Sequence, residues 1–478
     1  MASFGSEHAP RCQWLSSWPA DVGGAIARLR ALFTGASDVS LVRRLAGAAF
    51  VIRIAAAMLA FLSQIVLARW LGGFEFGIYV YAWTWLLLIG GVGDLGLGSA
   101  AQRFIPEYAE HKQLALLRGF LAGSRWLALI IASAVGSLAV GIIALSPLGN
   151  STSFLPLCLA CASLPAFAVA NVQSGIARSY DWINLGLMPT YVLRQIMLIG
   201  LMGAAYAAGL PMDAVTTMLA TLISLWACTL GQLWVLDRRL GTVVERGPKA
   251  YAARSWLSTS TPISLVEGFY TLLTYCDVIV LTQFRPPQEV AVYYAAAKTL
   301  SLVAFIYFAV AQTVAHKFTE YHVAGDRQRL DAFLAHAIRM TFWPSLALIG
   351  VFLALGEPLL RMFGKDFVSG YHLMFIIAIG LLARAAVGPA ERLLNMLGER
   401  RACAQVYGGS FLLNLVLCIA LIPHLGAAGA AAASATALVF ESVCLFLVAK
   451  YRLGFHCLIF GRAQAPSQAR ANDRAKNR

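Results

Sequence analysis

The chain has 478 residues, of which 59% are hydrophobic and only 13% are charged, and its formal net charge is +14. Soluble domains carry about 25% charged residues, so this composition excludes an ordinary soluble protein and predicts one embedded in a membrane. A net positive charge can also indicate a nucleic-acid-binding protein, so its distribution along the chain must be considered.

Apolar runs of bilayer-crossing length follow one another along most of the chain. A helix needs about 20 apolar residues to cross a bilayer, and backbone groups must be paired within the helix in lipid. We therefore predict an all-α integral membrane protein with about 12 transmembrane helices. The predicted spans are 46–68, 77–98, 119–145, 153–175, 186–208, 214–236, 259–283, 291–315, 335–356, 371–388, 405–423 and 427–450.

The basic residues predict the orientation of these spans. If the N-terminus is cytoplasmic, the inward-facing segments carry 27 Lys and Arg residues, the outward loops carry 4, and the remaining 6 of the 37 lie within spans. Lys and Arg concentrate in cytoplasmic loops, so we expect a multi-pass protein with both termini cytoplasmic. The positive charge then reflects topology, and no nucleic-acid partner is expected.

Composition also suggests how the chain is divided. The first 40 residues are polar and basic and do not look like a cleavable signal peptide, although residues 22–34 could form an amphipathic helix on the membrane surface. The predicted parts are a cytoplasmic N-terminal extension (1–45), a first six-helix bundle (46–240), a cytoplasmic junction loop (241–258), a second six-helix bundle (259–460) and a disordered basic cytoplasmic tail (461–478).

The two predicted bundles look like copies of each other. An alignment of the chain with itself that places Glu75 on Glu289 also places Tyr79 on Tyr293, and it needs no gap from the first predicted span to the third. Each copy has six spans, so both copies share one orientation in the membrane. Parallel repeats of this kind are typical of transporters.

Six basic residues lie within the predicted spans, where each costs roughly 2.5–3.5 kcal/mol if it faces lipid. Those near span ends are expected to extend to the headgroups, whereas Arg194, in mid-span, is expected to lie in an interior salt bridge or a cavity. The residues near span ends are Arg125, Arg339 and Arg384, and the others are Arg53, Arg194 and Lys298.

The first and seventh spans are predicted to line a central cleft from opposite sides. Arg53 and Gln64 share one face of the first span, and the repeat aligns Arg53 with Glu267, close to Asp277 in the seventh span. Lys298 in the eighth span is a third candidate. The alternatives are a static ion pair for Arg53 and Glu267, and a side chain that reaches outward for Lys298.

Motifs for catalysis and cofactors are missing from the sequence or lack their usual context. Residues 91–96 match GxGxxG but end a membrane span instead of following a strand, so close helix packing is the better interpretation. The sequence has no phosphate-binding GxxxxGK[ST] loop and no HExxH metal motif. We therefore expect no catalytic residues, no metal and no cofactor. The short outward loops argue against a membrane enzyme of glycan assembly.

Three segments resemble a known family. They are Ala68 to Tyr108 (ARWLGGFEFGIYVYAWTWLLLIGGVGDLGLGSAAQRFIPEY), Asp277 to Tyr293, and Leu421 to Ala430 (LIPHLGAAGA). They are similar to signatures of polysaccharide transporters, the lipid-linked oligosaccharide flippases of the multidrug/oligosaccharidyl-lipid/polysaccharide (MOP) superfamily. The usual Gly before the second-repeat Tyr is replaced here by Ala291-Val292-Tyr293.

The resemblance implies a flippase that moves an undecaprenyl-diphosphate-linked oligosaccharide across the bacterial inner membrane for exopolysaccharide or O-antigen biosynthesis. Its partners would be this glycan lipid, the bilayer and, as candidates, a polymerase and a chain-length protein. A central cationic cavity would alternate its access. The rivals are a multidrug/cation antiporter of the same superfamily and, less favoured, a membrane enzyme of glycan assembly. The expected substrate-binding residues are Arg53, Lys298, Arg194 and Gln64, and the coupling or ion-pair residues are Glu267 and Asp277.

Overall fold

The computed structural model describes residues 38–324 and 326–459, and every structural statement below concerns these residues. The chain forms two compact units, residues 1–51 and residues 52–478. In the first unit, residues 38–51 are helical. The second unit contains the rest of α2 and the described helices that follow it. The predicted surface helix at 22–34 and the predicted tail at 461–478 lie outside the described residues.

In the described part of the chain, 11 helical segments are long and apolar enough to cross a membrane. The first of these, Ile54–Glu110, has 57 residues, about twice what one crossing requires. It contains a break at Gly72, whose φ of 72° and ψ of 173° are not helical. Glycine adopts a positive φ readily because it has no Cβ, so the chain turns here without strain. Dividing the segment at Gly72 gives the predicted 12 spans.

The first six spans lie in residues 52–243, which we call the first half. Helix α2 begins before this half, and its later part belongs to it. The elements are α2 (Asp38–Gly93), α3 (Leu97–Glu110), α4 (Leu114–Leu145), η1 (Pro147–Asn150), α5 (Phe154–Ser179), α6 (Ile183–Met188), the π-helical turn η2 (Pro189–Leu193), α7 (Arg194–Ala207) and α8 (Ala214–Val243).

The other six spans lie in residues 253–459, the second half. Its elements are α9 (Ala253–Phe284), α10 (Pro287–Ser301), α11 (Ala304–Val323), α12 (Arg327–Ala354), α13 (Gly356–Phe363), η3 (Lys365–Gly370), α14 (Tyr371–Val387), α15 (Ala390–Met396), α16 (Arg400–Leu425), α17 (Ala427–Val448) and η4 (Ala449–Leu453). Helices α8 and α9 both extend into the predicted junction loop, so the break between them covers only residues 244–252.

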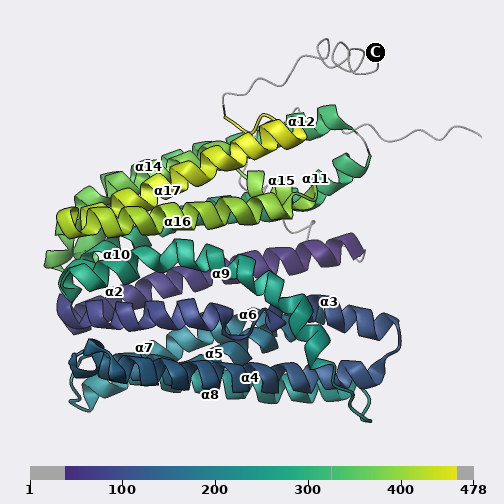
Figure 1. The fold of residues 1–478 in the computed structure, drawn as a ribbon, viewed down its shortest axis with the longest axis horizontal. Helices are drawn as coiled ribbons and strands as arrows, with labels where there is room; N and C mark the ends of the chain where they lie inside the picture. Colours follow the sequence, from purple (N-terminus) through teal and green to yellow (C-terminus); the bar gives the residue numbers. More distant parts are fainter. Residues whose placement is uncertain (1–37, 325, 460–478) are drawn as a thin grey trace, which may run out of the picture. The chain divides into compact units, whose positions relative to one another are not determined.

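The helices confirm the predicted repeat of two six-helix bundles. Helices α4 and α12 begin at Leu114 and Arg327, helices α8 and α17 begin at Ala214 and Ala427, and the interval along the chain is the same for both pairs. In the first half α5, the fourth span, packs against α4 and α8, and in the second half its counterpart α14 packs against α12 and α17 (Figure 1). Corresponding helices therefore occupy corresponding places in the two bundles.

The second arm of α2, after Gly72, packs directly against the second half. A Cβ built on Gly77 would overlap the backbone oxygen of Pro287 at the start of α10. The Gln283 side chain donates a hydrogen bond to the Tyr81 hydroxyl (3.1 Å), and the Phe76 ring meets Tyr294 edge-on at 6.2 Å. This contact places residues of α2 beside α9 and the start of α10, two helices of the second half.

Candidate cationic and polar binding site

The centre of the candidate site is Arg194, the first residue of α7. Its side chain is 7% exposed, its Nε donates a hydrogen bond to the Thr190 backbone oxygen (3.3 Å), and its guanidinium lies 4.7 Å from the centre of the Trp83 ring. Its Nη1 is buried without a hydrogen-bond partner among the described residues. The residue follows the π-helical turn η2, and such turns often occur at functional sites.

Lys298, on α10 of the second half, is near enough to Arg194 for the two positive charges to interact. The side chain is half-buried, and its charge and that of Arg194 repel each other. Across the described ranges, neither residue has an acidic side chain within salt-bridge distance. Unpaired charges inside a protein cost free energy. A bound anion would offset that cost.

Gln64 completes the set of predicted substrate-binding residues that the structure brings together. It is 4% exposed, and its Oε1 has no hydrogen-bond partner among the described residues. The Tyr79 hydroxyl lies beside Gln64 and interacts electrostatically with Arg194. Tyr79 thus links Gln64 to Arg194. The side chain of Arg53 is outside the described part, so its role stays a prediction.

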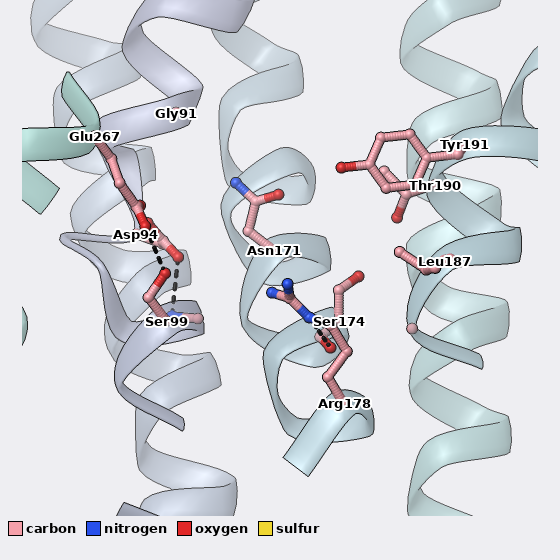
Figure 2. Close-up of a pocket in the computed structure, with 12 residues that line it drawn as sticks. Gly91, Asp94, Ser99, Asn171, Ser174, Arg178, Leu187, Thr190, Tyr191 and Glu267 are labelled. Carbon is pink, nitrogen blue, oxygen red and sulfur yellow. Dashed lines mark hydrogen bonds between the residues drawn. The ribbon is translucent and has the colours of Figure 1, made fainter. Parts of the chain in front are cut away.

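A polar cavity of about 230 Å³ adjoins this cationic centre. Asp94, Ser99 and Glu267 lie on one side of it, Thr190 and Tyr191 lie opposite, and a polar row on α5 lies between them (Figure 2). Thr190 and Tyr191 belong to η2, which ends immediately before Arg194. The cavity and the cationic centre are therefore adjacent along the chain, and Arg194 bonds to the Thr190 backbone oxygen. The row on α5 consists of Asn171, Ser174 and Arg178.

The two carboxylates of the cavity have distinct surroundings. Asp94 is buried and accepts hydrogen bonds from the backbone N–H groups of Gly96 (3.1 Å) and Gly98 (3.0 Å), so it caps the start of α3. This agrees with interpreting the GxGxxG match as a helix-packing feature. Glu267, on α9 of the second half, is exposed and accepts a hydrogen bond from the Ser99 hydroxyl (2.8 Å) on α3. That bond crosses between the two halves.

Asp277 lies in a separate polar cluster inside the second half. Its side chain is 7% exposed and accepts hydrogen bonds from the Tyr293 hydroxyl, the Ser434 hydroxyl (2.8 Å) and the Val278 backbone N–H (2.8 Å). These partners are all neutral. Gln64 and Asp277 each lie beside one of the two tyrosines that the repeat aligns, Tyr79 and Tyr293.

Two expectations about the span residues are wrong. Arg125 does not extend freely to the headgroups, because its Nη1 lies 2.6 Å from an Asp237 carboxylate oxygen. Arg384 is only 20% exposed and lies 3.8 Å from Glu441, whose side chain is 1% exposed. Glu441 makes the interior position of Arg384 favourable, whereas Asp237, the partner of Arg125, is 55% exposed. Arg339 is exposed, as predicted.

Several residues of the site were not singled out from the sequence. Asn171, Ser174 and Arg178 follow helical spacing along one face of α5, and this polar row in an apolar span was a usable signal. Tyr191 gave no such signal, because aromatic residues are common in membrane helices. Its place beside Arg194 is evident only in three dimensions.

Comparison with known families gives two matches. A family described as polysaccharide biosynthesis protein matches residues 43–316, which is more than half of the chain. The chain belongs to this family. The MatE family also matches, over residues 262–420. Among curated proteins there is no significant match.

Solved structures of the MOP superfamily share the fold of this polysaccharide biosynthesis family member. A lipid II flippase, MurJ, in its inward closed conformation is 17% identical with a TM-score of 0.67, covering 84% of this chain and 87% of its own. An inward-facing multidrug resistance MATE family transporter is 15% identical with a TM-score of 0.70, covering 85% and 98%.

A third similar structure is a MOP superfamily transporter from Pyrococcus furiosus. It is 15% identical with a TM-score of 0.62, and the match covers 87% of this chain and 96% of the other. Together, the family match and the shared fold identify the chain as a multi-pass flippase or transporter of the MOP superfamily. By their names, the first of these structures is a flippase and the other two are transporters.

Proposed function

We propose that this protein is a flippase for an undecaprenyl-diphosphate-linked oligosaccharide used in exopolysaccharide or O-antigen assembly in the bacterial inner membrane. The observation that carries the proposal is the pair Arg194 and Lys298, one from each half, with no acidic partner among the described residues. A guanidinium can donate two parallel hydrogen bonds to phosphate oxygens, and an ammonium adds a compact charge. The pair therefore suits a diphosphate.

A ligand that binds both cations would link the two halves. While the site is empty, Arg194 and Lys298 repel each other, whereas a diphosphate between them would attract both. The oligosaccharide would occupy the polar space beside the cations, and the lipid tail would stay in the bilayer. With the proposed cytoplasmic termini, an inside-negative potential favours outward movement of the headgroup by roughly 2.3 kcal/mol per charge per 100 mV.

Arg53 is proposed as a third contact to the diphosphate, and Gln64 as a neutral donor beside it. Glu267 and Asp277 are the candidates for coupling to an ion gradient. Of these two, Asp277 lies in a closed, fully hydrogen-bonded cluster, whereas Glu267 lies at the cavity itself. A coupling ion at Glu267 would therefore be exchanged with the substrate site directly.

The test is lipid analysis of a bacterial strain that lacks this protein and is complemented with variants. Loss of the chain should remove the surface polymer and cause a complete polyprenyl-linked repeat unit to accumulate, measured by mass spectrometry. Arg194→Ala and Lys298→Ala should reproduce that accumulation at normal protein levels, and Arg194→Lys should restore part of the export. Arg339→Ala, on the exposed surface of α12, is the matched control and should export normally. Normal export by the first two variants would contradict the site.

The second candidate function is a multidrug/cation antiporter, which the match of residues 262–420 to the MatE family supports. The cations at the centre argue against it, because they would repel a cationic drug. In the same deletion strain, new sensitivity to cationic dyes without any build-up of lipid-linked glycan would favour the antiporter.

A further inference from the structure

We infer that the polar cavity between Asp94, Asn171, Tyr191 and Glu267 is a subsite for one sugar unit of the headgroup. This inference rests on the proposed function, because it supposes that the diphosphate binds at Arg194 and Lys298. It adds a second binding site, which recognises the sugar, next to the site that binds the charged diphosphate.

The chemistry of the lining fits a hydroxylated ligand. Each sugar hydroxyl both donates and accepts a hydrogen bond, so it needs partners of both kinds. The cavity presents an acceptor carboxylate in Glu267, a guanidinium donor in Arg178, an amide with both functions in Asn171, and the hydroxyls of Ser99 and Thr190. Figure 2 shows these groups on different sides of one space.

Two groups of the lining have spare hydrogen-bonding capacity. The Thr190 hydroxyl oxygen is buried and has no partner within the described residues. Only one oxygen of the Glu267 carboxylate accepts the hydrogen bond from Ser99, and the side chain is exposed to the cavity. A carboxylate has two oxygens and about four acceptor positions, so Glu267 can still bind a ligand.

The charge of the cavity separates it from the phosphate site. Asp94 and Glu267 outnumber the single cation Arg178, so a second phosphate would be repelled there. A free organic cation is also disfavoured, because both oxygens of Asp94 already accept backbone hydrogen bonds and Arg178 lies on the facing row. A neutral polar group fits this balance best.

Position and size agree with a sugar bonded to a diphosphate. The turn η2 supplies Thr190 and Tyr191 to the cavity and ends at Arg194, so a group held in the cavity lies next to the cationic centre. A water molecule occupies about 30 Å³ of liquid, so about 230 Å³ corresponds to about eight waters, a volume suited to one pyranose ring. The exposed Tyr191 ring offers an apolar face to such a ring.

The experiment compares lipid probes that differ only in the sugar. The full chain in nanodiscs would be titrated with farnesyl diphosphate and with farnesyl diphosphate carrying glucose, galactose or N-acetylglucosamine. At least one sugar-bearing probe should bind about tenfold more tightly than the sugar-free probe, as two or three added hydrogen bonds can provide. Asn171→Ala should remove this gain without changing the affinity for farnesyl diphosphate.

Controls make the outcomes separable. Asn150→Ala, at the exposed end of η1, should keep the full gain, and Arg194→Ala should weaken binding of every probe. If farnesyl diphosphate binds but no sugar increases the affinity, the subsite is wrong and the diphosphate site stands. If no diphosphate probe binds, the proposed function and the subsite both fail. If tetraphenylphosphonium binds instead and Glu267→Gln abolishes it, the cavity is a site for organic cations.

Discussion

Glu75 and Glu289, which the sequence repeat aligns with each other, make the same contact in the two halves of the protein. The Glu75 carboxylate accepts a hydrogen bond from the backbone N–H of Ala214 (2.9 Å), the first residue of α8. The Glu289 carboxylate accepts one from Ala427 (2.6 Å), the first residue of α17. Each carboxylate therefore caps the sixth span of its half, whose first N–H groups have no partner within the helix.

We predict that each of these caps stabilises the fold by a similar amount. Glu75→Ala and Glu289→Ala should each cost about 1–2 kcal/mol, because a hydrogen bond to a charged group and a favourable helix-dipole contact are lost together. Thermal unfolding in detergent would measure the loss, and the glutamine variants should keep part of the stability. Glu110→Ala, at the exposed end of α3, is the control and should change little. Equal stability of all three alanine variants would contradict the capping role.

Replacing glycine with alanine should have opposite effects on stability at Gly77 and at Gly141. A methyl group at Gly77 would meet the Pro287 backbone oxygen, so Gly77→Ala should force α2 away from α10 and cost about 1–3 kcal/mol. Gly141 on α4 has nothing within 4 Å of the added Cβ, so Gly141→Ala should stabilise its helix by about 0.5–1 kcal/mol. Melting temperatures of the two purified variants would move in opposite directions. A stable Gly77→Ala protein would show that the two helices can separate freely.

The repeat could be predicted from the sequence because it preserves polar residues that have a structural role. The alignment of Glu75 with Glu289 gave no hint of capping, but it placed both residues at equivalent positions. Arg194 was predicted to lie in the interior because a charge in mid-span cannot face lipid. For Arg194, the free-energy cost of a charge in the bilayer was enough to predict an interior position.

Pairs between distant helices could not be predicted in the same way. Arg384 and Glu441 lie on α14 and α17, and a single sequence does not show which buried acid meets which base. The partner of Ser99 is likewise hidden in the sequence, because the repeat alignment pairs Glu267 with Arg53 instead. Such contacts depend on how helices pack, and small residues allow many packings.

Gln64→Glu should make the protein more stable and less active. A carboxylate at position 64 would lie beside Tyr79 and in the field of the Arg194 charge, where it would provide the missing counter-charge. The melting temperature should rise, and the affinity for farnesyl diphosphate should fall about tenfold or more, since a close charge pair can contribute over about 1.4 kcal/mol. Gln64→Met, which keeps a similar shape without charge, should leave most of the affinity. A tighter-binding Gln64→Glu protein would contradict the cationic site.

Asp277→Asn tests whether the buried cluster couples transport to an ion gradient. The substitution keeps the shape of the side chain and its contacts with Tyr293 and Ser434 but removes the charge that an ion or proton would neutralise. In proteoliposomes, flipping of a fluorescent prenyl-diphosphate-linked sugar should respond to an imposed proton or sodium gradient with the native protein and not with this variant. Asp366→Asn, exposed on η3, is the control. Unchanged gradient dependence of Asp277→Asn would leave Glu267 as the coupling candidate.

The hydrogen bond between Ser99 and Glu267 should stabilise the contact between α3 and α9 beside the cavity. Ser99→Ala removes the hydroxyl that donates to Glu267 across the two halves, while the helix backbone stays intact. We expect amide hydrogen exchange in α3 and in the facing part of α9 to rise about threefold, the size of effect expected from losing one modest hydrogen bond.

The matched control is Ser258→Ala, because the Ser258 hydroxyl donates to the Ser255 backbone oxygen of its own helix α9. This variant should leave exchange between the halves unchanged. Farnesyl diphosphate bound to Arg194 and Lys298 should lower the exchange of the Ser99→Ala protein again, because it links the halves at a second point. Equal exchange in Ser99→Ala and the native protein would mean that helix packing alone holds α3 against α9, and that Glu267 is free to serve the cavity.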